Sequence, residues 1–289
     1  MNLTWRDKLR GIKQITRLDK PIGIYLLLWP TFWALWVAAR SHPDLYLIIV
    51  FSLGVVIMRS AGCVINDFAD RKVDGEVERT KNRPLVSGLL TSQEAINLFG
   101  LLIGIALFLV FTLSWYTIGL SVVALILATI YPFMKRYTQL PQVVLGAAFS
   151  WGMIMAFAEI LGEVPPVAWV LFFANLTWTV AYDTMYAMVD RDDDLRIGVK
   201  STAILFGQYD TRIIGFLQII TLGLLWTVGE LEALGWPYQL SLVICGALFS
   251  YQQMLISKRD KKSCFDAFLN NHWVGLIIFV GFYIEYISY

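Results

Sequence analysis

The sequence contains few charged residues, few cysteines and few histidines, and each shortage excludes a class of protein. Only 16% of the 289 residues are charged, whereas 57% are hydrophobic. A water-soluble domain of this length needs more polar surface, so the composition predicts an integral membrane protein. The three cysteines and two histidines have no disulfide or metal-ligand spacing, so we expect reduced thiols and no zinc site. No basic stripe interleaved with aromatic residues is present, so nucleic-acid binding is not expected.

Apolar stretches long enough to cross a bilayer recur along the whole chain. About 20 helical residues are needed to cross the hydrocarbon core, and turns with proline, glycine or polar residues separate the stretches. We therefore predict an all-α, polytopic membrane protein with nine transmembrane helices in one domain over residues 1–289. The predicted spans are 22–39, 45–66, 95–113, 115–134, 141–161, 166–189, 211–229, 236–256 and 267–288.

Lysine and arginine residues fall almost entirely on one side of this predicted topology. Of the 23 Lys and Arg residues, all but Arg40 and Arg59 lie before the first span or around the loops that follow even-numbered spans. Positively charged loops stay in the cytoplasm, so we predict a cytoplasmic N-terminus and, with an odd number of spans, a periplasmic C-terminus. Residues 1–20 lack the features of a signal peptide, and we expect them to form a cytoplasmic segment, with an amphipathic helix on the bilayer surface.

A first cluster of carboxylates follows the second span, in the segment VINDFADRKVDG over residues 64–75. We term Asn66, Asp67, Asp70 and Asp74 the first Asp group. If the helix continues through the segment, Asp67 and Asp74 project within about 20° of each other and Asp70 lies about 60° away. The spacing therefore predicts a polar stripe on one helical face.

A second cluster follows the sixth span, in the segment AYDTMYAMVDRDDD over residues 181–194. We term Asp183, Tyr186, Asp190 and Asp194 the second Asp group, and helical spacing again places them on one face. Both groups lie at cytoplasmic ends of even-numbered spans. They can therefore face each other across one cavity.

So many carboxylates in one cavity cannot all stay ionised without a counter-charge. Hard oxygen ligands in this number match Mg²⁺, which usually keeps several waters and bridges carboxylates to phosphates. We therefore expect the aspartates of both groups, with Asn66, to bind Mg²⁺ and to take part in catalysis. A solvated helix end is the simpler interpretation of any single cluster, and it is retained for Asp192 and Asp193, which lie off the stripe.

Basic residues from three separate loops lie on the same predicted side of the membrane as the two Asp groups. Carboxylates, a divalent metal and convergent Lys and Arg side chains are the components of a diphosphate site. The positive-inside rule alone is a sufficient explanation of any one of these residues. The candidate substrate-binding residues in these loops are Lys81, Arg83, Lys135, Arg136, Arg196 and Lys200.

Arg59 differs from these residues because it lies within the second span. It precedes Asn66 by seven residues and so projects about 20° from it on the same helical face. An unpaired arginine inside a membrane is costly. Arg59 should therefore meet either a carboxylate of the cluster or an anionic group of a substrate, such as a carboxylate.

The pattern N-D-x-x-D-x-x-x-D in the first Asp group, joined with D-x-x-Y-x-x-x-D-x-x-x-D in the second, resembles the UbiA superfamily of intramembrane prenyltransferases. The stretches RLDKPIGIYLLLWPTFWALW, RTKNRPLVSG and YPFMKRYTQLPQVVLGAAFSWG are similar to its branch that prenylates 4-hydroxybenzoate. The resemblance runs over about residues 10–285. It implies nine helices around a central cavity that opens laterally to lipid. By motif position, it further implies that Asn66, Asp67, Asp70 and Asp74 form a first metal–diphosphate group and that Asp183, Asp190 and Asp194 form a second, with Tyr186 beside the second.

The resemblance further implies an activity and its substrates. A polyprenyl group would pass from polyprenyl diphosphate to the ring carbon ortho to the hydroxyl of 4-hydroxybenzoate, in ubiquinone biosynthesis at a bacterial inner membrane. The expected partners are these two substrates and the lipid bilayer, without an obligate protein partner. Two alternatives stay open: another branch of the superfamily with a different acceptor, and a cation transporter that uses intramembrane carboxylates.

Overall fold

The computed structural model describes residues 4–76 and 80–287, so Arg79 of the basic loop lies outside the described residues. Every regular element in the described part is helical. The helices are α1 (Trp5–Ile15), α2 (Ile22–Ala39), α3 (Leu45–Asp70), the 3₁₀ turn η1 (Asp74–Glu76), α4 (Ser92–Val110), α5 (Trp115–Tyr137), α6 (Pro141–Leu161), α7 (Pro166–Ile197), α8 (Thr202–Phe206), the 3₁₀ turn η2 (Gly207–Tyr209), α9 (Asp210–Leu231), α10 (Trp236–Ile256) and α11 (Lys261–Ile287).

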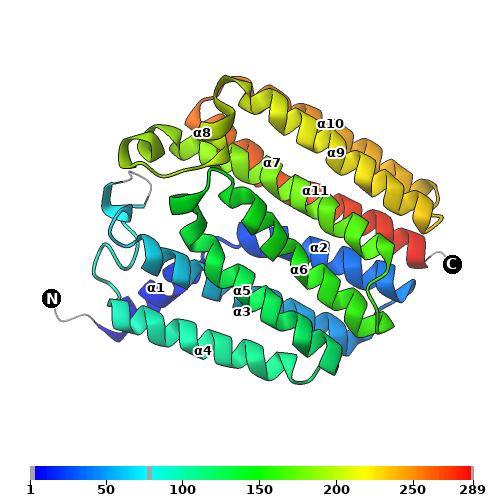
Figure 1. The fold of residues 1–289 in the computed structure, drawn as a ribbon, viewed down its shortest axis with the longest axis horizontal. Helices are drawn as coiled ribbons and strands as arrows, with labels where there is room; N and C mark the ends of the chain where they lie inside the picture. Colours follow the sequence, from blue (N-terminus) through cyan, green and yellow to red (C-terminus); the bar gives the residue numbers. More distant parts are fainter. Residues whose placement is uncertain (1–3, 77–79, 288–289) are drawn as a thin grey trace.

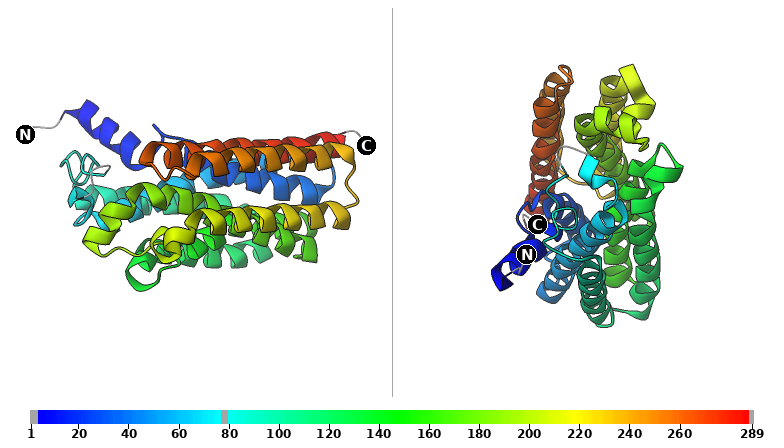
Figure 2. Two further views of the ribbon diagram at one scale, coloured as in Figure 1. Left: turned by 90° about the horizontal axis from the view of Figure 1, so that it is seen from above. Right: turned by 90° about the vertical axis from the view of Figure 1, so that its left-hand side faces the viewer.

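The long helices form one elongated bundle, with their axes along its length (Figure 1). The segment between α3 and α4, the short helix α8 and the N-terminal helix α1 lie at one end (Figure 2). The end of α11 lies at the other. Helix α7 occupies the interior, packed against α6, α9 and α11. This arrangement gathers the long polar loops, and with them both Asp groups, at a single end of the bundle.

Local sequence signals explain where several helices begin and end. Thr91 and Glu94 form a capping box at the start of α4, in which each side chain accepts from the backbone N–H of the other. Proline occupies the first turn of α6 and α7, where its missing N–H costs nothing. Gly198 adopts φ 73° directly after α7, the left-handed conformation that ends a helix. This glycine therefore turns the chain away at the end of the second Asp group.

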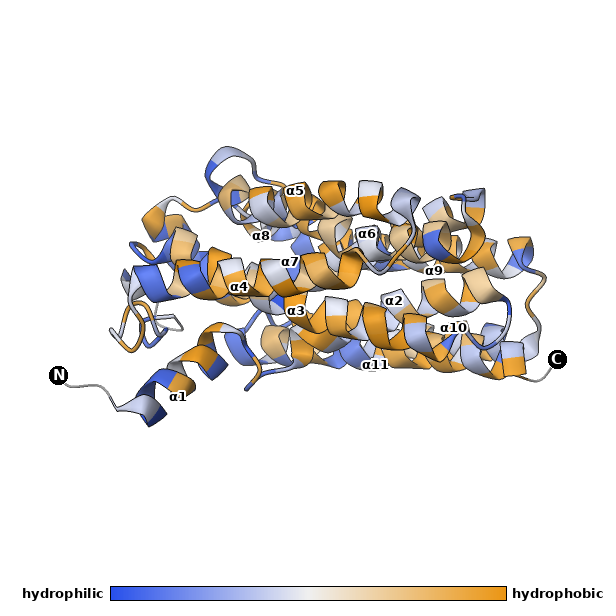
Figure 3. Cartoon of the chain, turned by 90° about the horizontal axis from the view of Figure 1, so that it is seen from below, coloured by the Kyte–Doolittle hydropathy of each residue, from blue (hydrophilic) through white to orange (hydrophobic). Residues whose placement is uncertain are grey.

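Hydrophobic residues predominate along most of the length of the long helices (Figure 3). Only 11% of the residues in the most apolar stretches of α4 and α5 are buried inside the protein. Large side chains such as Leu101, Phe108 and Ile126 are exposed on these helices. Hydrophilic residues gather at the end that carries α1 (Figure 3). An apolar belt around a bundle with a polar end is what a bilayer requires.

Eight helices in the described part are long and apolar enough to cross a membrane. They correspond to eight of the nine predicted spans. The exception is α7, whose 32 residues give ample length but whose buried side chains include Asn175, Thr179 and Thr184. These polar groups lie inside the protein, so they lower the average hydropathy of α7 without facing lipid.

The two Asp groups differ in whether the helix continues through them. Helix α7 continues to Ile197, so the second Asp group lies on one continuous helix, as its spacing predicts. The assumption of a continuous helix is wrong for the first group, because α3 ends at Asp70 and Asp74 begins the 3₁₀ turn η1. Asp74 is therefore placed by the loop that follows α3 and not by helical periodicity.

Candidate active site

A cavity of about 810 Å³ opens at the polar end of the bundle. Its walls come from the α1–α2 segment, from α3 and the loop after it, and from α5, α6, α7 and the first turns of α11. Its volume falls within the range of cavities that hold one small-molecule ligand. The first-group members that line it are Asn66, Asp70 and Asp74, and all four members of the second group line it as well.

Asp70 is held at the cavity wall by a lysine from a neighbouring helix. Its carboxylate, 2% exposed, forms an ion pair with the ammonium group of Lys135 at the end of α5. The other carboxylate oxygen, Oδ1, is buried and has no hydrogen-bond partner in the described part of the chain. A buried carboxylate oxygen without a donor is costly, which leaves it available to a cation bound in the cavity.

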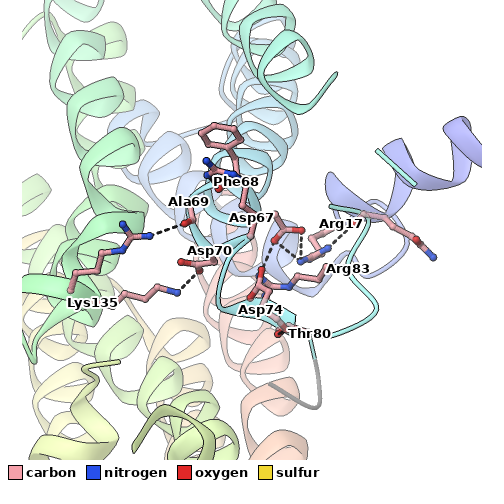
Figure 4. Close-up of polar contacts among 12 residues, drawn as sticks. Arg17, Asp67, Phe68, Ala69, Asp70, Asp74, Thr80, Arg83 and Lys135 are labelled. Carbon is pink, nitrogen blue, oxygen red and sulfur yellow. Dashed lines mark hydrogen bonds and ion pairs between the residues drawn. The ribbon is translucent and has the colours of Figure 1, made fainter. Parts of the chain in front are cut away.

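Asp67 lies behind this wall and is absent from the described residues that line the cavity. Its carboxylate is 1% exposed and accepts from Nη2 of Arg17 at 2.8 and 3.1 Å. Nη1 of Arg83 lies 3.0 Å from the same carboxylate (Figure 4). We term Arg17, Asp67 and Arg83 the arginine clasp. It joins the segment after α1, the end of α3 and the loop before α4.

Asp74 is linked to the clasp through Arg83, whose Nη1 donates to Asp74 Oδ2 at 2.8 Å. The hydroxyl of Thr80 donates to the backbone carbonyl of Asp74 at 2.7 Å and fixes the turn (Figure 4). Burial raises the pKa of the Asp74 carboxyl above its ordinary value, and the neighbouring Arg83 guanidinium offsets part of that rise. A positive charge beside Asp74 therefore favours its ionised form.

The loop after α7 adds Lys200 to the cavity wall. The backbone N–H of Lys200 donates to the carbonyl of Lys135 at 3.1 Å, and its ammonium group donates to the carbonyl of Tyr137 at 3.2 Å. These bonds tie the end of α5 to the chain directly after the second Asp group. Lys135 and Lys200 thus lie beside different Asp groups but are connected through one backbone contact.

Arg59 lines the inner part of the cavity, on the same helix as Asn66 and about 10 Å further along it. Its side chain forms no ion pair with any described carboxylate, and its Nε atom is buried without a partner. It lies 5.9 Å from the ring centroid of Phe149, with Gly23 packed against its guanidinium. Of the two partners predicted for Arg59, the structure excludes an aspartate of the described chain.

Several predicted substrate-binding residues do not reach the cavity. Lys81 and Arg136 are absent from the described cavity lining. Arg136 donates instead to the carbonyl of Ala69 at 2.7 Å, at the last turn of α3. Arg196 pairs with the buried Asp193 three residues earlier on α7. Arg136 and Arg196 therefore stabilise the ends of the helices that carry the Asp groups.

The structure adds basic residues that the sequence did not single out. Arg17 and Lys20 reach the cavity from the segment between α1 and α2, and Lys261 and Lys262 reach it from the start of α11. From the sequence, the positive-inside rule alone explains these residues, and nothing in it predicts that they reach a cavity. The sequence predicts α1 on the bilayer surface, but Ile15 at its end is fully buried in a small apolar cluster with Val64.

The side chains at the cavity fit Mg²⁺. They are carboxylate and amide oxygens, and Asp70 presents a buried oxygen that lacks a donor. Within residues 4–76 and 80–287, no three His, Cys, Asp or Glu side chains already form a closed metal site. Mg²⁺ does not need one, because it keeps waters and takes oxygens from substrate phosphates.

Comparison with known proteins agrees with this architecture. A model of the UbiA prenyltransferase family matches residues 27–276. The chain is 71% identical over 282 residues to the 4-hydroxybenzoate octaprenyltransferase of Colwellia psychrerythraea, covering 98% of each chain. It is 57% identical over 281 residues to the enzyme of the same name from Salmonella paratyphi B, covering 97% of each.

Solved structures agree on the fold. A UbiA homolog from Aeropyrum pernix K1 superposes with a TM-score of 0.79 at 25% identity, over 89% of this chain and 96% of that one. A UbiA homolog from Archaeoglobus fulgidus, bound to GPP and Mg²⁺, gives a TM-score of 0.75 at 19% identity, over 96% of this chain and all of the other. With the family match spanning most of the sequence, these findings place the chain in the UbiA prenyltransferase family.

Proposed function

We propose that this protein transfers an octaprenyl group from its diphosphate to 4-hydroxybenzoate in ubiquinone biosynthesis. Relatives of this name match at 57–71% identity over nearly the full length. The observation that carries the proposal is the composition of one cavity, which is lined by aspartates of both groups, by several basic residues and, on its inner wall, by Arg59, whose buried Nε has no hydrogen-bond partner among the described residues. These are the groups that a lipid diphosphate and an aromatic acid require.

The diphosphate of the donor binds at the outer, charged part of the cavity. Asn66, Asp70 and Asp74, together with the second Asp group, would hold Mg²⁺, and the bound ion would supply positive charge beside the diphosphate. Arg83, Lys135 and Lys200 add fixed positive charge to the same wall. Stabilising the leaving group more than the bound substrate is what accelerates cleavage of the C–O bond.

The aromatic acceptor binds further in, with its carboxylate on Arg59. A guanidinium binds a carboxylate with two parallel hydrogen bonds, which satisfies the buried Nε atom of Arg59. The distance of about 10 Å along α3 from Arg59 to Asn66 leaves room for one ring between them. The ring carbon ortho to the hydroxyl then faces the C1 carbon of the donor.

The reaction follows from this placement. Ionisation of the C–O bond gives an allylic cation, which the ortho carbon attacks, and the ring proton passes to an aspartate or to the diphosphate. Leu145, Phe149 and Tyr131 line the cavity around the reacting region and limit the access of water. The prenyl chain is longer than the cavity and extends along the apolar helices toward the bilayer.

We further infer that the chain is one membrane-embedded domain with nine spans. Helix α7 is the ninth, because its flanking segments lie at opposite ends of the bundle (Figure 1). The basic end faces the bacterial cytoplasm by the positive-inside rule. This orientation exposes the mouth of the cavity to the cytoplasm, where a soluble aromatic acid and Mg²⁺ are both supplied.

The proposal is tested by removing one carboxylate from each Asp group. We expect Asp70→Ala and Asp190→Ala each to lower octaprenyl transfer to 4-hydroxybenzoate by at least about 10²-fold, because charge stabilisation of the leaving group is lost. Transfer is measured in membranes with Mg²⁺, and thermal unfolding of the purified variants checks the fold. Asp192→Ala, exposed on the same helix and outside the cavity lining, is the control. Full activity in both cavity variants would contradict the proposal.

A further inference from the structure

The loop between α10 and α11 is fastened to the α7 end of the cavity by one buried carboxylate. Asp210, the first residue of α9, is completely buried. It forms an ion pair with Arg191, which follows Asp190 on α7. It also accepts from Nε and Nη2 of Arg259 in the α10–α11 loop, at 3.0 and 2.8 Å. Three segments far apart in the sequence thus meet at Asp210.

The loop is held in a definite conformation. Arg259 has φ 52°, a left-handed conformation that a residue other than glycine adopts only when its surroundings impose it. Nη2 of Arg259 also donates to the carbonyl of Gln208 at 2.8 Å. Asp260 then caps α11 by accepting from the backbone N–H of Ser263 at 2.9 Å. These contacts fix the point at which α11 begins.

The first turns of α11 lie beside the second Asp group. Phe268 packs on Tyr186 of that group with ring centroids 4.8 Å apart. Lys261, Lys262 and Phe265 line the same cavity as Asp190 and Asp194. The start of α11 is therefore a wall of the site.

Lys261 and Lys262 differ from most of the cations of the cavity in their lack of partners. Arg83 and Lys135 each form an ion pair with an aspartate of the first group. In the described part of the chain, no hydrogen bond or ion pair joins the ammonium group of Lys261 or Lys262 to another residue, and both side chains are exposed. Two unpaired ammonium groups at the mouth of a site rich in carboxylates are available to an anion.

We propose that Lys261 and Lys262 bind the diphosphate of the prenyl donor, and that Asp210 is a positioning residue that holds them at the cavity through Arg259 and Arg191. This proposal rests on the proposed function and names a further wall of its diphosphate site. Lysine acts here as a point charge with three donors, which suits a phosphate group that approaches from solvent. The α10–α11 loop and the start of α11 thereby contribute to the diphosphate site, in addition to the two helix ends that carry the Asp groups.

The experiment compares the double variant Lys261→Gln/Lys262→Gln with Lys258→Gln, which removes an exposed charge from the same loop outside the cavity lining. We expect the double variant to raise the KM for the prenyl diphosphate about tenfold or more, as expected when a charge-assisted hydrogen bond is lost. The KM for 4-hydroxybenzoate and the activity of Lys258→Gln should stay near wild type. An unchanged donor KM in the double variant, or an equal rise in Lys258→Gln, would overturn the proposal.

A binding measurement separates this proposal from the proposed function. Inorganic diphosphate with Mg²⁺ should raise the thermal unfolding temperature of the wild-type protein, and the double variant should lose most of that shift. A shift as large as that of the wild type would overturn the lysine assignment while leaving the prenyl transfer reaction intact. If the double variant loses the shift and the wild-type protein transfers no octaprenyl group, the lysine site is supported and the proposed function is contradicted.

The positioning role of Asp210 has its own test. Because removal of a buried carboxylate leaves Arg191 uncompensated and can unfold the protein, Arg259→Gln is examined beside Asp210→Asn. Each should raise the donor KM with little change in acceptor KM, and neither should add to the effect of the Lys261→Gln/Lys262→Gln double variant. Asp210→Glu should restore part of the donor affinity. Fully additive effects, or an equal rise in both KM values, would reduce Asp210 to a structural residue.

Discussion

At the scale of single residues, Gly23 and Arg59 form the contact on which the acceptor site depends. A Cβ atom on Gly23 would lie 2.3 Å from Nε of Arg59, closer than any real contact. The guanidinium is the flexible end of a long side chain, so it would move and the fold would remain. We expect Gly23→Ala to displace the Arg59 guanidinium and to raise the KM for 4-hydroxybenzoate, by a smaller factor than Arg59→Ala does.

The magnitude follows from the charge-assisted hydrogen bonds involved. Loss of the Arg59–carboxylate pair should raise the acceptor KM about 10- to 100-fold, with a much smaller effect on the donor KM, in steady-state measurements on membranes. Gly54→Ala on the same helix as Arg59 is the control, because nothing lies within 4 Å of its Cβ position. An equal rise in both KM values for Arg59→Ala would assign Arg59 to the diphosphate instead.

At the scale of elements, the arginine clasp makes α1 a part of the site. Asp67 is buried between Arg17 and Arg83, and the described cavity lining does not include it. We expect Asp67→Asn to leave the Mg²⁺ concentration for half-maximal activity near the wild-type value, whereas Asp70→Asn should raise it. The physical reason is that the Asp67 carboxylate is already paired with two guanidinium groups, whereas Oδ1 of Asp70 has no hydrogen-bond donor in the described part of the chain.

The clasp also predicts how firmly α1 is held. Arg17→Gln and Asp67→Asn should each weaken α1 docking by about 1–3 kcal/mol and increase trypsin cleavage within residues 5–15. Lys8→Gln serves as the control, because the Lys8–Glu94 pair is partly exposed at both ends and contributes little.

The Mg²⁺ prediction for Asp67 has its own contradicting outcome. If Asp67→Asn and Asp70→Asn raise the required Mg²⁺ concentration equally, Asp67 is a metal ligand, as the motif predicts.

The helical elements also show where sequence reasoning succeeds and fails. The spacing of Asp183, Tyr186, Asp190 and Asp194 predicts one face, and α7 continues far enough to present it. The same arithmetic fails at Asp74 because α3 ends at Asp70. Helical periodicity holds only while the helix does, and a single sequence does not show where a loop with polar partners becomes more stable than another turn.

Residues placed by tertiary contacts were beyond the reach of the sequence. Arg17, Lys261 and Lys262 all look like ordinary cytoplasmic charges, since the positive-inside rule explains each of them. Their places at the cavity depend on Asp67 and Asp210, buried carboxylates outside the cavity lining. The carboxylates of the second Asp group were predictable because they form a periodic motif on one continuous helix. The basic residues that complete the cavity were not, because loop packing has no period.

At the scale of the whole molecule, the decisive feature is that α7 joins the two ends of the bundle although it is too polar to be recognised as a span by average hydropathy. Several of its polar groups are paired inside the protein: the amide Nδ2 of Asn175 donates to the hydroxyl of Ser150 at 2.9 Å, and the hydroxyl of Thr184 shares a hydrogen bond with that of Thr202 at 2.7 Å. Buried polar groups of this kind do not oppose membrane insertion, because they do not face lipid.

Cysteine accessibility tests this topology directly. The native Cys63, Cys245 and Cys264 are buried, so the wild-type chain should label weakly with a membrane-impermeant maleimide. We expect Glu163→Cys, before α7, to react in intact bacteria, and Asp192→Cys, near its end, to react only after the membrane is opened. Both positions are exposed in the structure. Reaction of both positions in intact bacteria would show that α7 does not cross and that the second Asp group lies on the periplasmic side. This group would then be separated from the charges of the cytoplasmic loops, and a shared diphosphate site could not form.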